Sequence, residues 1–250
     1  MTTFMTWLPF LIGLLILVLY ILAIKKIILK ITRRVSQFGY GFLVMFITAI
    51  VLLFIWRAFY LEATPTTDWE IEAENTNTAI IFGFGYKENC KGEMLPDTAN
   101  KTLYMQAIND ANFHYLIMQD GVLVAACKAD SLRNIRMHPH SPTIHINTIE
   151  AAQYAILKMD SLHVKKAMVY AHSQQLARAV FDLKRVAASN PKWHDFEFIT
   201  PAIPPTPYPR QSKQRYTRYE ITYVPLELLF MRPRDTLYPL CLLNKISLTY

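Results

Sequence analysis

Hydrophobic and polar positions divide the chain into an apolar N-terminal part and a longer part in which short apolar runs alternate with amphipathic ones. Two uncharged apolar runs come first, at Leu8–Ile24 and Val35–Trp56. Each is close to the roughly 20 residues that a helix needs to cross the hydrocarbon core of a bilayer. The pattern therefore predicts two transmembrane helices, with residues 1–60 forming a hairpin in the lipid bilayer.

The segment after this hairpin, residues 61–77, is rich in Thr, Glu and Asn and has no apolar period. Such a composition is typical of a loop, and it predicts a linker that lifts a domain away from the bilayer. The remaining residues, 78–250, then form one domain.

Short apolar runs and helical patterns alternate within this domain. Four runs have the length and residue types of buried strands, at Thr78–Phe82, His114–Met118, Lys166–Tyr170 and Phe196–Ile199. Apolar residues with helical spacing lie between them, from Asp97 to Asn109, from Thr148 onward and over Gln174–Ala188. Alternating strands and helices predict an α/β fold, with a Rossmann-like, mainly parallel sheet covered by helices on both faces.

Three further features complete the predicted domain. Asp120-Gly121 indicates a turn after the second strand. Pro201–Pro209 carries five prolines, so it predicts a stiff lip beside the binding cleft rather than a helix or central strand. Tyr219–Met231 predicts a closing helix interrupted near Pro225, which packs Leu226, Leu229 and Phe230 against the sheet.

Composition changes the picture little. Hydrophobic residues make up 52% of the chain, and the excess over an ordinary soluble protein is concentrated in the two N-terminal runs. The charge distribution predicts on which side of the membrane the domain lies. Five basic residues lie between the runs, namely Lys25, Lys26, Lys30, Arg33 and Arg34. Short loops rich in Lys and Arg are retained in the cytoplasm, so the domain is expected on the opposite side. The alternative, a cleaved signal peptide, would carry its charges ahead of the apolar run.

The formal net charge of +7 does not indicate nucleic-acid binding. Six of the 26 basic residues lie before Tyr60, which leaves 20 basic residues against 19 acidic ones in the rest of the chain. A nearly neutral domain lacks the basic footprint of a DNA- or RNA-binding protein. We therefore expect a lipid bilayer, and no nucleic acid, among the partners.

The cysteines leave two interpretations open. Cys90, Cys127 and Cys241 show no CxxC spacing. One pair could form a disulfide outside the cytoplasm, or all three could be unpaired thiols. The histidines His138, His140 and His145 lie close together, but no acidic residue accompanies them, so no metal site is predicted. The identity of any cofactor stays unknown.

Ligands of parallel α/β sheets bind beside the carboxyl ends of the strands, where the strand order reverses. Three segments are expected to meet there: the loop after Phe82, the segment around Asp120, and Ala171–Gln175. His172 lies in the last of these and is expected to line the cleft.

Each candidate residue has a functional and a structural interpretation. Gly83 and Gly85 could let a phosphate approach backbone N–H groups, or they could serve only a tight turn. Arg178 could bind phosphate or carboxylate, or it could be an ordinary surface arginine. Glu150 could be a general base or a hydroxyl-binding carboxylate, or a favourable charge in the first turn of a helix.

Four segments of the domain resemble the SanA, YdcF and ElyC group of bacterial envelope proteins, whose biochemical function is unsettled. They are the strand into Gly83-Phe-Gly85, Asn147–Glu150 at a helix start, Gln175–Ala179 after a strand, and Glu227 in the last helix. The order and spacing of these segments, over roughly Thr78 to Leu229, carry the resemblance, and two preceding membrane spans fit the ElyC-like arrangement.

The resemblance implies a multi-pass protein of the bacterial inner (cytoplasmic) membrane, with its C-terminal domain in the periplasm or extracytoplasmic space. It also implies a role in envelope integrity or peptidoglycan-related metabolism. The expected ligand is phosphorylated or glycosylated, such as a lipid-carrier phosphate or a sugar nucleotide. Glu150 and His172 are the candidate catalytic residues, and the candidate ligand-binding residues are Gly83, Gly85, Asp120, Thr148, Gln175 and Arg178.

The chain also departs from the family pattern. Ala151 stands where the family usually has Asn, and Gln175 stands where it usually has His, although His172 lies three residues upstream. The Gly-rich turn after the second strand is reduced to Gln119–Gly121. These losses motivate a second hypothesis, a non-catalytic structural or regulatory envelope protein with a degenerate site, and they leave open whether the chain is an enzyme.

Overall fold

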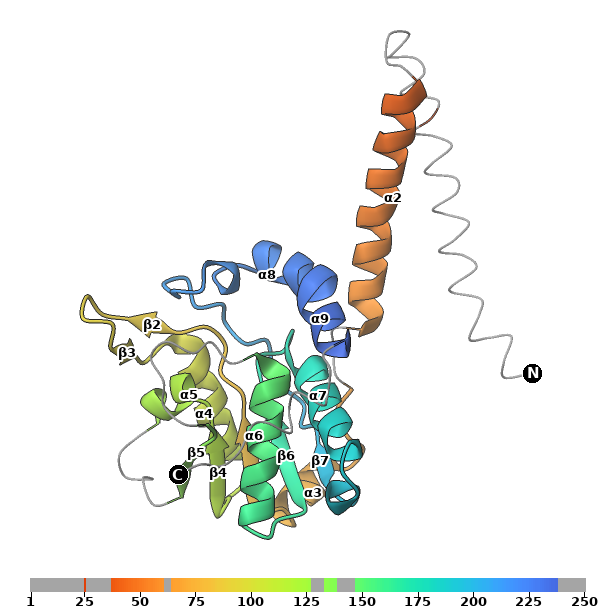
Figure 1. Ribbon diagram of the computed structural model, residues 1–250. Coiled ribbons are helices and arrows are strands. Elements are labelled where there is room, and N and C mark those ends of the chain that lie inside the picture. Colours follow the sequence, from red (N-terminus) through yellow and green to blue (C-terminus); the bar gives the residue numbers. More distant parts are fainter. Residues whose placement is uncertain (1–24, 26–36, 61–63, 127–132, 139–146, 238–250) are drawn as a thin grey trace. The chain divides into compact units, whose positions relative to one another are not determined.

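The computed structural model describes residues 25, 37–60, 64–126, 133–138 and 147–237 (Figure 1). The chain divides into two compact units, Met1–Ile55 and Trp56–Tyr250, which are described separately.

Helix α2, Gln37–Tyr60, begins in the first unit and coincides with most of the second predicted span. Its large apolar side chains are exposed, with Phe42, Met45 and Phe46 at 66%, 69% and 56%. Among the helices in the described ranges, none reaches the combination of length and apolarity that a membrane crossing requires. The first predicted span, Leu8–Ile24, lies outside the described residues.

The second unit is built on a five-stranded sheet in which every neighbouring pair is parallel, which confirms the predicted α/β fold. The strand order is β5-β4-β1-β6-β7. The bounds are β1 Thr78–Ile81, β4 Tyr115–Met118, β5 Asn134–Arg136, β6 Lys166–Tyr170 and β7 Glu197–Ile199. The chain adds β4 and β5 on one side of β1, then β6 and β7 on the other. The strand order therefore reverses between β1 and β6.

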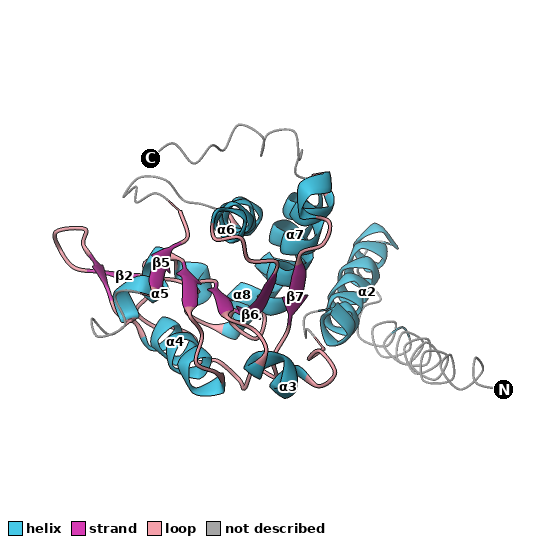
Figure 2. Cartoon of the chain, turned by 90° about the horizontal axis from the view of Figure 1, so that it is seen from below, coloured by secondary structure: helices cyan, strands magenta, loops and turns pink. Residues whose placement is uncertain are grey.

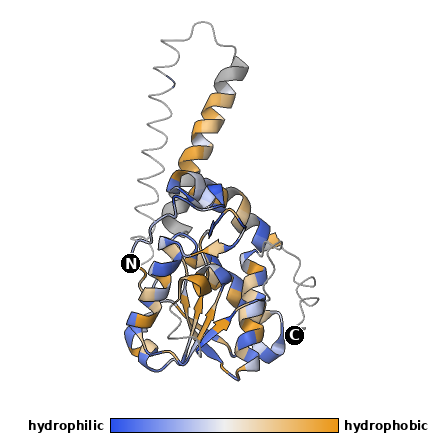
Figure 3. Cartoon of the chain, turned by 90° about the vertical axis from the view of Figure 1, so that its left-hand side faces the viewer, coloured by the Kyte–Doolittle hydropathy of each residue, from blue (hydrophilic) through white to orange (hydrophobic). Residues whose placement is uncertain are grey.

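Helices cover both faces of this sheet (Figure 2). Alternate residues of the central strand face opposite ways, so Ile80 packs in the cluster that includes α6 and α7, and Ile81 in the cluster that includes α4. The central strand β1 and its neighbours β4 and β6 are mostly apolar and buried (Figure 3), as expected for a sheet buried on both faces. The helices concerned are α3 Trp69–Glu74, α4 Thr98–Asp110, α5 Asp120–Ala125, α6 Thr148–Ser161 and α7 Leu176–Ala188.

Local capping explains where two of these helices begin. Asp97 accepts a hydrogen bond from the backbone N–H of Asn100 at 3.0 Å and caps α4. Asn147 and Glu150 form a reciprocal capping box at the start of α6, in which each side chain accepts from the other residue's backbone N–H. These helix starts agree with the sequence prediction.

Three features differ from the sequence prediction. Asp120-Gly121 opens the short helix α5 instead of forming a turn, because Gln119 adopts an extended conformation and its carbonyl accepts from the N–H groups of Val122 and Leu123. Strand β5 was not predicted, since it has only three residues and no apolar run. A small hairpin, β2 Lys87–Glu88 and β3 Met94–Leu95, occupies the polar loop after Gly85.

Part of the predicted linker is folded onto the domain. Two residues of α3, one helical turn apart, pack against the face of the sheet that α4 covers. Ala73 is buried there, and Trp69 is partly buried beside it. The backbone N–H of Thr66 donates to the carbonyl of Thr200 at 2.8 Å, and Lys166 forms an ion pair with Glu72. A single apolar turn is too short to give a period that sequence analysis detects.

The C-terminal segment crosses the carboxyl ends of the strands. Pro201–Pro209 has no regular structure, as predicted. It leads through a 3-10 turn, Arg215–Thr217, to α8 Glu220–Leu226, a π-helical turn Glu227–Met231, and α9 Arg232–Leu237. Another 3-10 turn, Pro191–Trp193, precedes β7. The expected packing of Phe230 was wrong, because Phe230 is 64% exposed and Tyr223 and Val224 are the buried residues.

Candidate functional site

The point at which the strand order reverses lies between the carboxyl ends of β1 and β6. The chain leaves β1 through Phe82–Gly85 and leaves β6 through Ala171–Gln175. The C-terminal segment described above covers both exits. The structure therefore brings the loop after Phe82 and Ala171–Gln175 together under a cover formed by residues 206–235. The segment around Asp120 joins them through Gln119, whose Oε1 accepts a hydrogen bond from the N–H of Gly83.

The backbone amides of the Gly83–Gly85 loop are engaged by side chains of this chain. The N–H of Gly83 donates to Gln119 Oε1 at 2.6 Å, and the N–H of Phe84 donates to Asn100 Oδ1 at 2.8 Å. Asn100 also donates to the carbonyl of Gly85 at 3.1 Å. These contacts clamp the loop, and in this arrangement the two amides are not available to a phosphate.

Gly85 is required both by its backbone conformation and by its surroundings. Its φ of +68° lies in the left-handed region, which other residues rarely adopt. A Cβ atom on Gly85 would lie 2.7 Å from both Ser212 Oγ and Thr217 Oγ1. The cover over the site therefore rests directly on this glycine.

Four aromatic rings fill the space above β1 and β6. The ring of His172 stacks on Phe84, with centroids 3.7 Å apart and planes at 18°. Tyr208 packs edge-on against both rings, and Tyr223 meets Phe84 at 4.7 Å. His172 is fully buried, so it lines the switch point as predicted from the sequence, but under the cover rather than open to solvent.

Burial sets the protonation state of His172. Desolvation lowers the pKa of His172 to about 4, partly opposed by the backbone of Thr206, so the ring is neutral at pH 7. The backbone N–H of Gln174 donates to its Nδ1 at 3.3 Å, which assigns the proton to Nε2. Among the described residues Nε2 makes no hydrogen bond of ordinary geometry.

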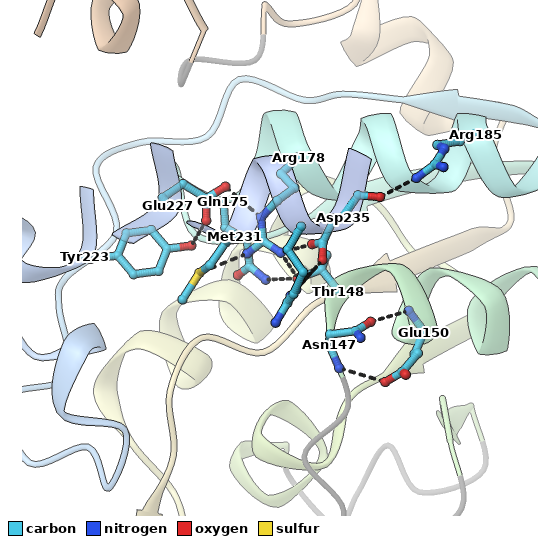
Figure 4. Close-up of polar contacts among 11 residues, drawn as sticks. Asn147, Thr148, Glu150, Gln175, Arg178, Arg185, Tyr223, Glu227, Met231 and Asp235 are labelled. Atoms are coloured by element: carbon cyan, nitrogen blue, oxygen red, sulfur yellow. Dashed lines mark hydrogen bonds and ion pairs between the residues drawn. The ribbon is translucent and has the colours of Figure 1, made fainter. Parts of the chain in front are cut away.

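A buried charge network extends from this cluster (Figure 4). Arg178 on α7 donates from Nε to Glu227 Oε1 at 2.6 Å and forms an ion pair through Nη1 with Asp235 Oδ2 at 2.6 Å. Its Nη1 also donates to Thr148 Oγ1 at the start of α6. Tyr223 donates its hydroxyl to the second oxygen of Glu227 at 2.9 Å. Arg178 is thus held by residues from α6, the π-helical turn and α9.

A further carboxyl group, that of Asp182, lies beside this network. Asp182, one turn after Arg178 on α7, has both oxygens buried and makes no hydrogen bond with a described residue. Burial, reinforced by the nearby charge of Asp235, raises the pKa of Asp182 to about 8. The group is therefore mostly protonated at pH 7, and it can both donate and accept a hydrogen bond.

Gln175 has an unused acceptor beside the network. It stands at the N-cap of α7, where its Nε2 donates to Thr148 Oγ1 at 3.4 Å. Its Oε1 is buried and has no partner among the described residues. Buried polar atoms of this kind are costly unless a ligand, a water or another group satisfies them.

The other two candidate residues lie apart from this network. Glu150 serves the capping box of α6, and Asp120 forms an ion pair with Arg136 Nε at 3.2 Å. Thr148, Gln175 and Arg178 contact one another, and His172 stacks on Phe84 between the two glycines. Glu150 and Asp120 are engaged in local contacts, although Gln119 and Gly121, the neighbours of Asp120, lie against the glycine loop.

Three residues of the site, Asp182, Asp235 and Tyr208, were not among the predicted candidates, and the sequence pattern indicates only the first of them. Asp182 follows Arg178 by four positions, so both lie on one face of α7, a spacing that identifies a polar stripe on an otherwise amphipathic helix. Asp235 lies two residues after Pro233, where helix is disfavoured, and nothing in the pattern indicates its burial. Tyr208 likewise lies in the proline-rich stretch without a periodic signal.

The cysteines and histidines outside the site are only partly covered by the described residues. Cys90 is exposed and has a free thiol, while Cys127 and Cys241 lie outside the described residues, as do His140 and His145. Over residues 37–60, 64–126, 133–138 and 147–237, no three side chains gather with the geometry of a metal site.

Comparisons with known proteins add no information on the function of this site. The chain matches no protein-family model, no curated protein and no solved structure.

Proposed function

We propose that the chain is a membrane-anchored protein of the bacterial cell envelope that acts in envelope integrity or peptidoglycan-related metabolism. Its α/β domain binds a glycosylated or phosphorylated ligand at the switch point between β1 and β6. The anchor is a two-helix hairpin of residues 1–60, and the domain lies on the extracytoplasmic side.

The membrane part of the proposal is supported by the sequence and by the surface of α2. Residues 35–56 contain no charged side chain, and the first acidic residue of the chain is Glu62. A helix that exposes Phe42, Met45 and Phe46 leaves a large apolar surface in water unless lipid or protein covers it.

One observation carries the functional part. Thr148, Arg178 and Glu227 lie in three separate segments, each of which carries part of the resemblance to the envelope family. In the structure the guanidinium of Arg178 contacts both of the other side chains, across 30 and 49 residues of sequence. The contact between these three side chains, at the edge of the sheet where a ligand is expected, supports the proposal that the three segments form one binding site.

The charges of this network favour binding of the sugar of the ligand over binding of its phosphate. Glu227 and Asp235 already compensate Arg178, so a phosphate would have to displace a carboxylate to reach the guanidinium. Gln175 Oε1 is instead an unused acceptor, and Asp182 can donate or accept. Hydroxyl groups satisfy both kinds of partner. The sugar of a sugar nucleotide or glycosylated lipid carrier fits these atoms better than its phosphate does.

A binding experiment on the full chain in detergent micelles tests this. A sugar nucleotide such as UDP-N-acetylglucosamine is compared with UDP, which lacks the sugar, by isothermal titration. We expect the sugar to increase affinity, and Gln175→Met to remove about a factor of 10 of that increase, because one buried hydrogen bond is lost. The exposed Gln211 provides the matched control, Gln211→Met. Equal affinity for UDP and UDP-sugar, or equal affinity of the two variants, contradicts the proposal.

A second candidate function has its own observation in favour. Arg178 is compensated by two carboxylates. The Nδ1 of His172 already accepts a hydrogen bond from Gln174, and burial lowers the pKa of His172 to about 4, so the ring is a weak base. A non-catalytic structural or regulatory envelope protein fits this arrangement. It predicts that Glu150→Ala and Gln175→Met restore envelope integrity in a strain that lacks the protein, whereas deletion of residues 1–60 does not.

A further inference from the structure

The cover over the site has an outer surface rich in apolar side chains. Tyr219, Ile221, Phe230 and Leu237 are 52%, 83%, 64% and 79% exposed. They come from a single stretch of 19 residues that contains α8 and α9. Scattered exposed apolar residues need no explanation, but four large ones on one short segment do.

The inner face of the same stretch fixes this outer surface in place. Glu227, Met231 and Asp235 recur every four residues, and each contacts Arg178. Phe230 and Leu237 lie seven residues apart, on an adjacent face of the same helical stretch. Because the ion pairs of Glu227 and Asp235 with Arg178 hold the inner face, Phe230 and Leu237 stay on the exposed side of the helical stretch.

Basic residues accompany the apolar ones. Arg210, Lys213 and Arg215 are exposed just before α8, and Arg218 is partly exposed. Lys213 is 3.4 Å from Glu88, and the only acidic residue between positions 210 and 226 is Glu220. Apolar side chains next to several Lys and Arg residues are typical of protein surfaces that lie in the interface of an anionic bilayer.

The tether keeps this surface near a bilayer. Helix α2 ends at Tyr60, and Thr66 is already hydrogen-bonded to Thr200 of the domain, through its backbone N–H at 2.8 Å and its hydroxyl at 2.9 Å. Six residues span at most about 20 Å when fully extended. If α2 is a membrane helix, the domain stays within that distance of the end of the helix.

We propose that the docking surface, defined as Tyr219, Ile221, Phe230 and Leu237 with Arg210, Lys213, Arg215 and Arg218, lies on the anionic phospholipid surface of the membrane that anchors the chain. This inference rests on the proposed function, because it requires the N-terminal hairpin to be in the bilayer. Docking would place the switch point between β1 and β6 beside the lipid headgroups, where the sugar or phosphate of a lipid carrier lies.

Spin-label accessibility on the full chain tests the docking. The three cysteines are replaced by serine, and a nitroxide is attached through Ile221→Cys or Phe230→Cys in nanodiscs of phosphatidylglycerol or of phosphatidylcholine. The matched control is Ile71→Cys on α3, an isoleucine that is 61% exposed at the other end of the sheet (Figure 1). Collision with a water-soluble nickel complex reports exposure to water.

In phosphatidylglycerol discs we expect collision rates at positions 221 and 230 at least fivefold below that at position 71, and a smaller difference in phosphatidylcholine discs. The double variant Arg210→Glu/Arg215→Glu should abolish the protection, because the electrostatic attraction is reversed. Lys101→Glu/Lys184→Glu changes the charge equally at two exposed positions elsewhere and should leave the protection intact.

Two results overturn the docking. One is equal accessibility at the three labelled positions in phosphatidylglycerol. The other is protection that is independent of lipid charge and accompanied by spin–spin broadening, which indicates a second copy of the chain as the occupant. Alkaline carbonate extraction of the same samples tests the anchor separately. Chain that resists extraction but exposes position 221 refutes only the docking, whereas extracted chain refutes the proposed membrane anchor.

Discussion

Replacing Arg178 by methionine should destabilise the α/β unit strongly. The side chains of Arg178, Glu227 and Asp235 are only 5%, 0% and 1% exposed, so solvent screens their charges little. Methionine keeps an unbranched chain but removes the positive charge, which leaves two buried carboxylates without compensation. Breaking a buried ion pair by removing one partner costs about 3–5 kcal/mol. We expect the free energy of unfolding at pH 7 to fall by about 4 kcal/mol.

The assay is urea unfolding of the full chain in detergent micelles, followed by tryptophan fluorescence, since Trp193 is buried in the unit. The triple variant Arg178→Met/Glu227→Met/Asp235→Leu removes all three charges and should recover at least half of the loss, because well-packed apolar residues often replace a buried ion cluster at little cost.

Two results would refute the inference that a compensated buried charge network closes the site. One is a loss below about 1 kcal/mol in Arg178→Met. The other is a triple variant that is no more stable than Arg178→Met.

Two further predictions concern single positions. Because burial and Asp235 raise the pKa of Asp182 from 3.8 to about 8, wild-type stability falls as the pH rises between these values. Asp182→Asn should therefore be more stable than wild type in urea unfolding near pH 9, by on the order of 2 kcal/mol, and this difference should shrink as the pH falls toward about 5; parallel pH profiles would contradict this. Gly85→Ala should cost at least about 1 kcal/mol more than Gly92→Ala in urea unfolding, since both glycines have positive φ but only Gly85 has atoms within 3.0 Å of the added Cβ. Equal costs would show that the cover does not rest on Gly85.

Apolar pattern alone was enough to predict most of the sheet. The strands at Thr78–Ile81 and Lys166–Tyr170 are continuous buried runs, and their alternation with amphipathic helices fixed the parallel arrangement. Strand β5 was missed because an edge strand of three residues, Asn134–Arg136, needs no apolar run. Helix α5 was missed because Asp120-Gly121, a common turn pair, begins it.

The sequence predicted where the candidate site lies, but not that its residues are buried or which charges compensate one another. His172, Gln175 and Arg178 were placed at the carboxyl edge of the sheet because they follow β6 directly, and the structure has them there. Their burial depends on a cover that begins more than 25 residues later along the chain. Local patterns carry no information about which distant carboxylates will compensate a charge, so the ion pair with Asp235 could be found only in the folded chain.

The membrane topology is the central claim of this account, and a reporter fusion tests it most directly. The basic residues Lys25 to Arg34 between two apolar runs predict that the domain lies across the membrane from the cytoplasm. Alkaline phosphatase, which is active only outside the cytoplasm, and green fluorescent protein, which fluoresces when folded in the cytoplasm, are each fused after Tyr250 in a bacterial host. We predict an active phosphatase and a dark fluorescent protein. A fluorescent fusion together with an inactive phosphatase would place the domain in the cytoplasm and contradict the envelope function.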